Sequence, residues 1–280
     1  MAAQNERKLN RLEALLPEGL LVDAAWLSNH GYSTSLRSQY VASGWLKQPT
    51  RQVYTRPRGS PSWQQVVISL QTLLGLPLVV GGRTALELLG FAHYLAHETM
   101  QVHLYGSKRP PAWLNKLSLG VRFDYRNSER LFHEASAKTR RLKDEDMTGP
   151  ESHPTLPDAA FVTQPWGQWG WHITLSSPER AVLELLDELP DHESFEQVDK
   201  LIEGLPNLSP QRLQKLLRDC HSVKVKRLFF YFADRHQHAW LRRINKSEID
   251  LGRGKRMLAR GGTFNAAYQI TVPENFDAVR

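Results

Sequence analysis

The amino-acid sequence predicts an α+β protein with two domains, a small one over residues 1–60 and a mixed α/β one over residues 61–280. The first observation is the order of elements expected in residues 5–58, which runs helix, helix, turn, helix and two-strand ribbon. The second is that strand-like alternation over residues 78–125 gives way, after residue 177, to four helical segments. The third is size, because 280 residues with 41% hydrophobic content suit about two globular domains and exclude a mainly disordered chain.

The small domain carries the periodicity and the capping residues of three short helices. An apolar stripe at helical spacing predicts a helix over residues 5–16. Asp23 is the expected N-cap of a second helix, and Ser33 or Thr34 caps a third over residues 35–43. Two strands and a tight turn then fill residues 45–55. This order of elements is that of a winged helix-turn-helix.

The larger domain is expected to begin with alternating helices and strands and to continue with capped helices. The sequence predicts helices over residues 63–75 and 83–89, and strands over residues 78–80, 101–105 and 121–125. Helix starts are marked at Ser177, Ser194 and Ser209, and a further helix is expected over residues 225–235. Polar, proline-containing residues 143–158 predict a loop, and strand-like segments return at residues 255–260 and 268–272.

The third helix of the small domain is the expected DNA-reading element. In a winged helix-turn-helix this helix enters the major groove, while the strand ribbon contacts the backbone or the minor groove. Its candidate contacts to bases or phosphates are Ser33, Thr34, Ser35, Arg37, Ser38 and Gln39. Arg37 lies near the inward arc of the helical wheel, which favours a phosphate over a base. On the wing, the expected phosphate contacts are Arg51, Arg56 and Arg58. The alternative is a winged helix used for protein contacts alone.

Charge is distributed unevenly along the chain, whose formal net charge is +7. Residues 1–60 carry net +4, residues 61–217 net −4 and residues 218–280 net +7, with 14 acids concentrated in residues 144–203. Basic ends point to a polyanion, nucleic acid before membrane. A second basic surface is a candidate near the C-terminus: Arg242, Arg243, Lys246, Arg253, Lys255, Arg256 and Arg260. The alternative is that these cations form an ordinary solvated face.

Several features of the sequence bear on membrane, metal or catalytic functions, and they favour none of these functions. No run reaches the roughly 20 apolar residues of a membrane span, and the N-terminus leads into no apolar signal segment, so we expect a cytoplasmic protein. A single cysteine, Cys220, makes no internal disulfide or cysteine-based zinc site. Histidine pairs at 93/97 and 236/238 lack further metal ligands, and the turn over residues 252–255 lacks P-loop spacing. Glu98 and Asp124 lack the Glu-x-Lys of a nuclease site. We therefore expect no cofactor, no metal and no catalytic residues.

Six segments together resemble the AbiEi-type antitoxins, in the same order along the chain. They are Leu21–Leu46, Val79–Gly90, Ser177–Asp187, Ser222–Phe229, and the pair Asp250–Arg256 with Tyr268–Pro273. The resemblance spans nearly the whole chain, and residues 143–158 match no part of the family pattern. Its strength is the joint order of the segments, since no single one is distinctive.

The resemblance implies a DNA-binding transcriptional repressor that is also the antitoxin of a bacterial type IV toxin–antitoxin system, associated with abortive phage infection. Such proteins repress their own operon through the winged helix, typically at inverted repeats in double-stranded DNA. The C-terminal domain would counter a nucleotidyltransferase-like toxin, and a stable complex with that toxin is not expected.

Two other functions stay open at the level of sequence. One is an enzyme that processes nucleic acid or nucleotides while tethered to DNA by the winged helix. The other is an adaptor whose acidic helices, over residues 178–203, bind a basic protein partner. Cleavage that depends on a divalent metal would favour the first, and copurification of a stable partner the second.

Overall fold

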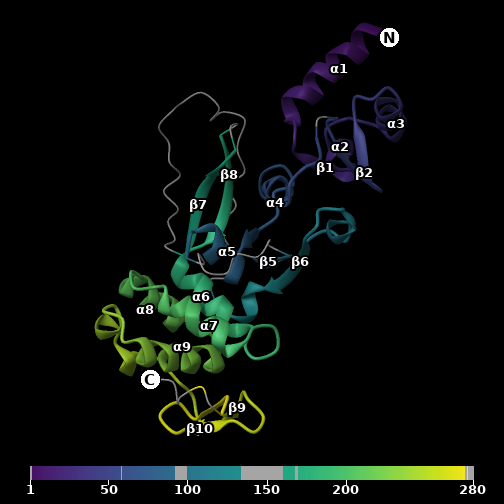
Figure 1. Ribbon diagram of the computed structural model, residues 1–280. Coiled ribbons are helices and arrows are strands. Elements are labelled where there is room, and N and C mark those ends of the chain that lie inside the picture. The colour runs from purple at the N-terminus through teal and green to yellow at the C-terminus, as the bar shows by residue number, and fades with distance from the viewer. Residues whose placement is uncertain are drawn as a thin grey trace.

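The computed structural model describes residues 2–57, 59–91, 100–133, 160–167, 170–274 and 276. Figure 1 shows the N-terminal helices at one end, a central sheet, a group of helices beyond it and a small sheet near the C-terminus. This confirms the α+β class, with a winged helix-turn-helix ahead of a mixed α/β region. The loop expected over residues 143–158 lies outside the described residues.

Three helices and a three-stranded antiparallel sheet form the N-terminal domain. In chain order they are α1 (Ala2–Leu15), β1 (Leu21–Asp23), α2 (Ala24–Asn29), α3 (Thr34–Ala42), β2 (Lys47–Thr50) and β3 (Val53–Thr55). The strand order is β1-β3-β2, which places β3 between two antiparallel neighbours. The sequence pattern predicts the three helices and the β2–β3 ribbon. It does not predict β1, because these three residues form a strand by pairing with β3, more than 30 residues away.

Side-chain caps fix where α2 and α3 begin. The Asp23 carboxylate accepts a hydrogen bond from the Trp26 N–H at 2.8 Å, and the Ser33 hydroxyl accepts one from the Leu36 N–H at 3.3 Å. At the other end of α3, Gly44 adopts a φ of +79°, which turns the chain toward β2 at no steric cost. Helix α3 therefore has both ends set by local chemistry, as the sequence predicts.

A five-stranded mixed sheet lies at the centre of the molecule. Its strands are β4 (Leu78–Val80), β5 (Gln101–Gly106), β6 (Arg122–Asn127), β7 (Phe161–Trp166) and β8 (Trp171–Ser176), in the order β6-β5-β4-β8-β7. The β4 strand pairs parallel with β8 and antiparallel with β5. Around the sheet lie α5 (Gly82–Leu88) and the 3₁₀ turns η1 (Leu114–Lys116) and η2 (Ser128–Arg130). The first three strands agree with the sequence pattern, which does not predict the β7–β8 hairpin.

Four capped helices pack together at the end of the sheet away from the winged helix (Figure 1). They are α6 (Pro178–Asp187), α7 (Phe195–Glu203), α8 (Pro210–Asp219) and α9 (Val223–His236). The hydroxyls of Ser177, Ser194 and Ser209 each accept a hydrogen bond from the backbone N–H three residues on, so all three predicted starts are confirmed.

A small sheet closes the described chain. It comprises β9 (Arg256–Met257), β10 (Thr263–Asn265) and β11 (Ile270–Val272), in the order β10-β11-β9. The 3₁₀ turns η3 (Leu241–Arg243) and η4 (Lys246–Glu248) connect it to α9. Ile270 and Val272 on the central strand are buried, so this sheet adds to the core of the helical region.

One helix, α4 (Trp63–Thr72), joins the winged helix to the central sheet. A reciprocal capping box between Ser62 and Gln65 fixes its start. The Ser69 hydroxyl then accepts the Leu21 N–H of β1 at 3.0 Å. On the same helix, the buried Gln71 amide donates to the backbone oxygens of Leu78 and Thr174 and accepts the Thr174 N–H, each at 2.9 Å. Both regions share one continuous hydrophobic core.

A buried carboxylate ties the β4–α5 turn to α6. Glu184 accepts hydrogen bonds from the Gly82 N–H, the Ser176 hydroxyl and the Arg180 guanidinium, at 2.8–3.0 Å. Burial raises the pKa of the Glu184 carboxyl, and the Arg180 charge acts in the opposite direction. The turn approaches so closely that a Cβ on Gly81 would overlap the Glu184 carboxylate. Glycine at this position is therefore a packing requirement of the fold.

Candidate nucleic-acid interface

The outer face of α3 is polar and uncharged. Thr34, Ser35, Ser38 and Gln39 are exposed on it, at helical positions that share one side of the helix. Residues 24–60 contain no Asp or Glu, so no carboxylate within that stretch opposes a phosphate backbone. Ser33 is also exposed, and its hydroxyl is occupied as the N-cap. This face has the side chains that hydrogen-bond base edges in a major groove.

Arg37, in contrast, lies in the interior of the domain. Its guanidinium donates to the Ala24 oxygen and the Ser28 hydroxyl at 2.7 Å, and to the Thr34 hydroxyl at 2.8 Å. The side chain is 6% exposed and cannot reach DNA without leaving this network. The expectation that Arg37 contacts a phosphate is therefore corrected: its side chain crosslinks α2 and α3.

The wing places its predicted arginines in three different situations. Arg51 is exposed at the β2–β3 turn, where a wing would meet phosphate. Arg56 is corrected from a phosphate contact to an internal ion pair, since its guanidinium lies 3.0 Å from Glu13 and 3.1 Å from Glu18. Arg58 lies outside the described residues. Lys47 at the start of β2 is exposed too, and it is not among the predicted wing contacts, all of which are arginines.

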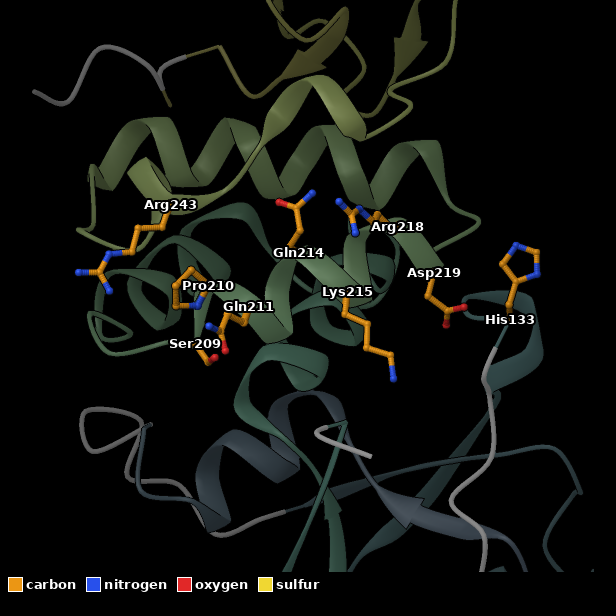
Figure 2. A pocket seen from close by; sticks show the side chains of 9 residues that line it. All are labelled: His133, Ser209, Pro210, Gln211, Gln214, Lys215, Arg218, Asp219 and Arg243. Carbon is orange, nitrogen blue, oxygen red and sulfur yellow. The ribbon is translucent and has the colours of Figure 1, made fainter. Parts of the chain in front are cut away.

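The predicted second basic surface is divided between two places. Arg243 of η3 lines a surface groove of about 920 Å³ beside α8, shown in Figure 2 with Lys215 and Arg218 along the same groove. Four of the predicted cations are exposed on or next to the small sheet: Arg253, Lys255, Arg256 and Arg260. Lys246 instead donates to the Tyr268 hydroxyl at 2.6 Å and lies over two aromatic rings, while Arg242 is exposed on η3. Helical periodicity identifies Lys215 and Arg218 as surface residues, and the fold alone brings them beside Arg243.

The acidic helices use most of their carboxylates inside the molecule. The pairs are Glu184 with Arg180, Glu188 with Arg126, Glu193 with Arg83, Asp199 with Arg235, and Glu179 with the Ser209 N–H. Glu188 joins the end of α6 to β6, and Glu179 joins α6 to the start of α8. Glu193 joins the segment before α7 to α5, Asp199 joins α7 to α9, and the Glu184–Arg180 pair lies within α6. The charge of this stretch therefore has a structural use, which weakens the case for an adaptor surface there. The acids of residues 144–158 lie outside the described residues.

The remaining candidates have structural roles wherever they are described. His236 pairs with Asp199 at 2.6 Å, and His238 bonds the Ile202 oxygen. Burial raises the pKa of the Cys220 thiol to about 11, so it stays protonated near neutral pH. Asp124 pairs with Arg122 at the start of β6, and Gly252 and Gly254 form a turn ahead of β9. Within the described ranges, no three His, Cys, Asp or Glu side chains gather as a metal site. His93, His97 and Glu98 lie outside those ranges.

This fold and surface define a protein in which a winged helix-turn-helix precedes a mixed α/β region. Residues 5–97 match the family described as transcriptional regulator, AbiEi antitoxin N-terminal domain, and residues 99–273 match transcriptional regulator, AbiEi antitoxin, type IV TA system. The chain belongs to the AbiEi family of antitoxins and transcriptional regulators of type IV toxin–antitoxin systems.

A solved structure shows the same fold at low sequence identity. The crystal structure of the RV2827C protein from Mycobacterium tuberculosis is 14% identical, with a TM-score of 0.52, over 95% of this chain and 89% of that one. No functionally curated protein matches the sequence. In the part of the chain that the structure covers, no helix is both long and apolar enough to cross a membrane.

Proposed function

We propose that this chain is a DNA-binding repressor of its own operon and the antitoxin that counters a nucleotidyltransferase-like toxin, without forming a stable complex with it. In this proposal the protein acts in the cytoplasm in phage defence and catalyses no reaction. The observation that supports it is the exposed polar face of α3, which lies in an acid-free stretch and precedes the cationic wing. Membership of a regulator and antitoxin family supports the same function.

The DNA-binding part of the proposal assigns a role to each exposed side chain. Gln39 can pair with an adenine edge, and Ser35 and Ser38 can bond base edges or phosphates. Arg51 and Lys47 would neutralise phosphates next to the groove that α3 occupies. Arg37 holds α3 against α2, which keeps the exposed side chains of α3 in a fixed orientation. Two protomers on an inverted repeat would present two such faces to one duplex.

The test measures binding of the full chain to a labelled duplex from the DNA upstream of its own reading frame. Replacing Ser38 and Gln39 together with Ala should weaken operator binding by about tenfold or more and leave binding to unrelated duplex unchanged, because base contacts carry the sequence preference. Arg51→Gln should weaken binding to both duplexes and lower the slope of log affinity against log salt by about 1.

Arg56→Gln is the matched control on the same wing. Because Glu13 and Glu18 already neutralise Arg56, its loss should leave the salt slope unchanged. Gln211→Ala, an exposed glutamine on α8, controls for the loss of Gln39. An unchanged preference for the operator in the Ser38/Gln39 variant would refute the assignment of α3 as the reading helix.

The antitoxin part is tested in cells that express the toxin encoded beside this chain. Coexpression of the full chain should restore growth, and the Ser38/Gln39 variant should restore it equally, since repression and neutralisation use different surfaces. Affinity purification from these cells should recover the chain without the toxin. Copurification at a fixed ratio would contradict neutralisation without a complex, and metal-dependent cleavage of DNA or RNA by the pure chain would favour the tethered-enzyme alternative.

A further inference from the structure

The small C-terminal sheet carries an exposed apolar row across its outer face. The strand register aligns Phe264 of β10 with Thr271 of β11, and Thr271 with Met257 of β9. Ile270 and Val272, on either side of Thr271, point into the core. Because side chains alternate along a strand, Phe264, Thr271 and Met257 all face outward. Phe264 is 41% and Met257 73% exposed, which is unusual for such large apolar side chains.

The sheet is held firmly against α9, so this row is a fixed surface. The buried Arg227 guanidinium donates to the backbone oxygens of Leu251 at 2.7 Å and Gly254 at 2.6 Å. The Tyr268 hydroxyl pairs with Asp234 of α9. Within the sheet, the Thr271 hydroxyl accepts the N–H groups of Leu258 and Ala259, at 2.8 and 3.1 Å. The hydroxyl in the middle of the row is therefore occupied, and the ring and the thioether remain as the outward contacts.

Positive charge lies beside the row at Lys255, within a cationic segment of the chain. Residues 251–273 contain four exposed cations, Arg253, Lys255, Arg256 and Arg260, and no Asp or Glu. Lys255 lies two residues before Met257, on the same side of β9, and its ammonium is 4.9 Å from the centre of the Phe264 ring. An aromatic ring at the surface is thus combined with exposed cations, and residues 251–273 contain no carboxylate that could neutralise them.

We propose that this surface binds single-stranded nucleic acid, with an unpaired base stacked on Phe264 and the flanking phosphates on Lys255 and its neighbouring arginines. Exposed aromatics among cations are the recognition elements of single-strand binding proteins, since every base offers a flat face once it is unpaired. A duplex hides those faces in its stack and would leave Phe264 and Met257 without a partner. A second copy of the sheet would bring four cations against four, which disfavours self-association through this row.

The inference goes beyond operator binding. Figure 1 shows the small sheet at the end of the molecule opposite the winged helix. One protomer therefore cannot place both surfaces on the same short half-site. The residues of the predicted second basic surface that lie on this sheet serve a different nucleic acid in this proposal. A negative result for single-strand binding would therefore leave operator binding by α3 unaffected. A negative result for operator binding would likewise leave the single-strand proposal unaffected.

The experiment titrates the full chain into fluorescein-labelled 12-nucleotide probes and follows their anisotropy. The probes are single-stranded DNA, single-stranded RNA of the same sequence, and the blunt DNA duplex, none of them containing operator sequence. We expect one or both single strands to bind more tightly than the duplex. Phe264→Ala should weaken single-strand binding by about tenfold, the loss typical of one stacked base, whereas Phe264→Tyr should retain it. Lys255→Gln should lower the salt slope by about 0.7, the single-strand value for one phosphate.

Matched variants separate stacking from general loss of structure. Met257→Ala should weaken single-strand binding, whereas Met100→Ala, an equally exposed methionine at the edge of β5, should not. Binding of the operator duplex should be unchanged in all of these variants, which shows that they are folded. Wild-type single-strand affinity in Phe264→Ala would overturn the proposal. So would binding to phosphatidylglycerol vesicles in place of the oligonucleotides, or a loss of self-association as the sole effect of Phe264→Ala.

Discussion

Arg37 illustrates how one side chain sets the geometry of the helix-turn-helix. Its bonds reach the start of α2, the hydroxyl of Ser28 and the first turn of α3. A single guanidinium thus spans the turn between the two helices and links α2 to α3 through these acceptors. The orientation of the exposed face of α3 therefore depends on this cation, whose own side chain is buried.

Arg37→Ala should lower the free energy of unfolding by about 2–3 kcal/mol, because the hydrogen bonds by which a charged donor links α2 to α3 are lost. Denaturant titration followed by circular dichroism measures the change. Ser38→Ala, the next residue on the exposed face, is the control and should change stability by less than about 0.5 kcal/mol. If Arg37→Ala is as stable as the native chain and yet binds operator DNA weakly, then Arg37 contacts DNA directly and its interior role is wrong.

The positions of Arg37 and Arg56 show which properties of a residue cannot be inferred from the sequence alone. Exposed positions on α3 follow from helical period and were predicted, as with Ser38 and Gln39. Arg37 lies beside the inward stripe of Leu36 and Tyr40, so the period alone cannot say whether its long side chain turns in or out. The partner of Arg56 is 43 residues away on α1, and no local pattern contains that contact. The sequence predicts DNA contacts for Arg37 and Arg56 because it does not show the partners that each one has within the fold.

Elements with local signals were predicted well, and those made by distant pairing were missed. Ser177 and Ser209 each precede a proline at the first helical position, and both helices begin there. The β7–β8 hairpin carries no such signal, since Pro165 interrupts the strand pattern at a position paired with His172. Helix starts depend on neighbours within four residues, whereas β1 depends on pairing with β3, 30 to 34 residues further along the chain.

The β4–α5 turn is an element at which a single added methyl group should be damaging. Gly81→Ala would place a Cβ 2.5 Å from the Tyr105 ring and against the Glu184 carboxylate, so the turn must move off α6. We expect a loss of about 1–3 kcal/mol in the free energy of unfolding, the usual cost of overpacking. The backbone of Gly81 is extended, so strain in φ does not contribute.

Gly204→Ala is the matched control for this substitution. Gly204 has a φ of −74°, and the nearest atom to an added Cβ is the Leu201 oxygen at 3.4 Å, an ordinary contact. Its melting temperature should therefore stay close to that of the native chain. Equal melting temperatures for Gly81→Ala and Gly204→Ala would show that the β4–α5 turn can accommodate a Cβ despite its close contact with Glu184.

At the scale of the whole molecule, the uneven charge of the sequence separates into three uses. The N-terminal cations include one exposed at the wing turn and one paired inside the domain. The acids of α6 and α7 join helices to the sheet. The C-terminal cations lie mainly on the small sheet, at the far end from the winged helix (Figure 1). Net charge predicted a polyanion partner, but the separation of the two basic surfaces depends on the helical region folded between them.

That separation is rigid only if the two regions unfold together, and α4 makes this a testable property. Gln71 bonds both β4 and β8, while Ser69 on the same helix bonds β1 of the winged helix.

Gln71→Ala should lower the free energy of unfolding by about 2–3 kcal/mol, since it leaves buried backbone groups unpaired. Hydrogen exchange in residues 20–55 and in β8, and labelling of the protonated Cys220 thiol, should all accelerate together. Gln211→Ala should leave them unchanged. Faster exchange in β8 with unaltered exchange in residues 20–55 would show two independent units, and the fixed distance between the operator-reading face and the small sheet would then be lost.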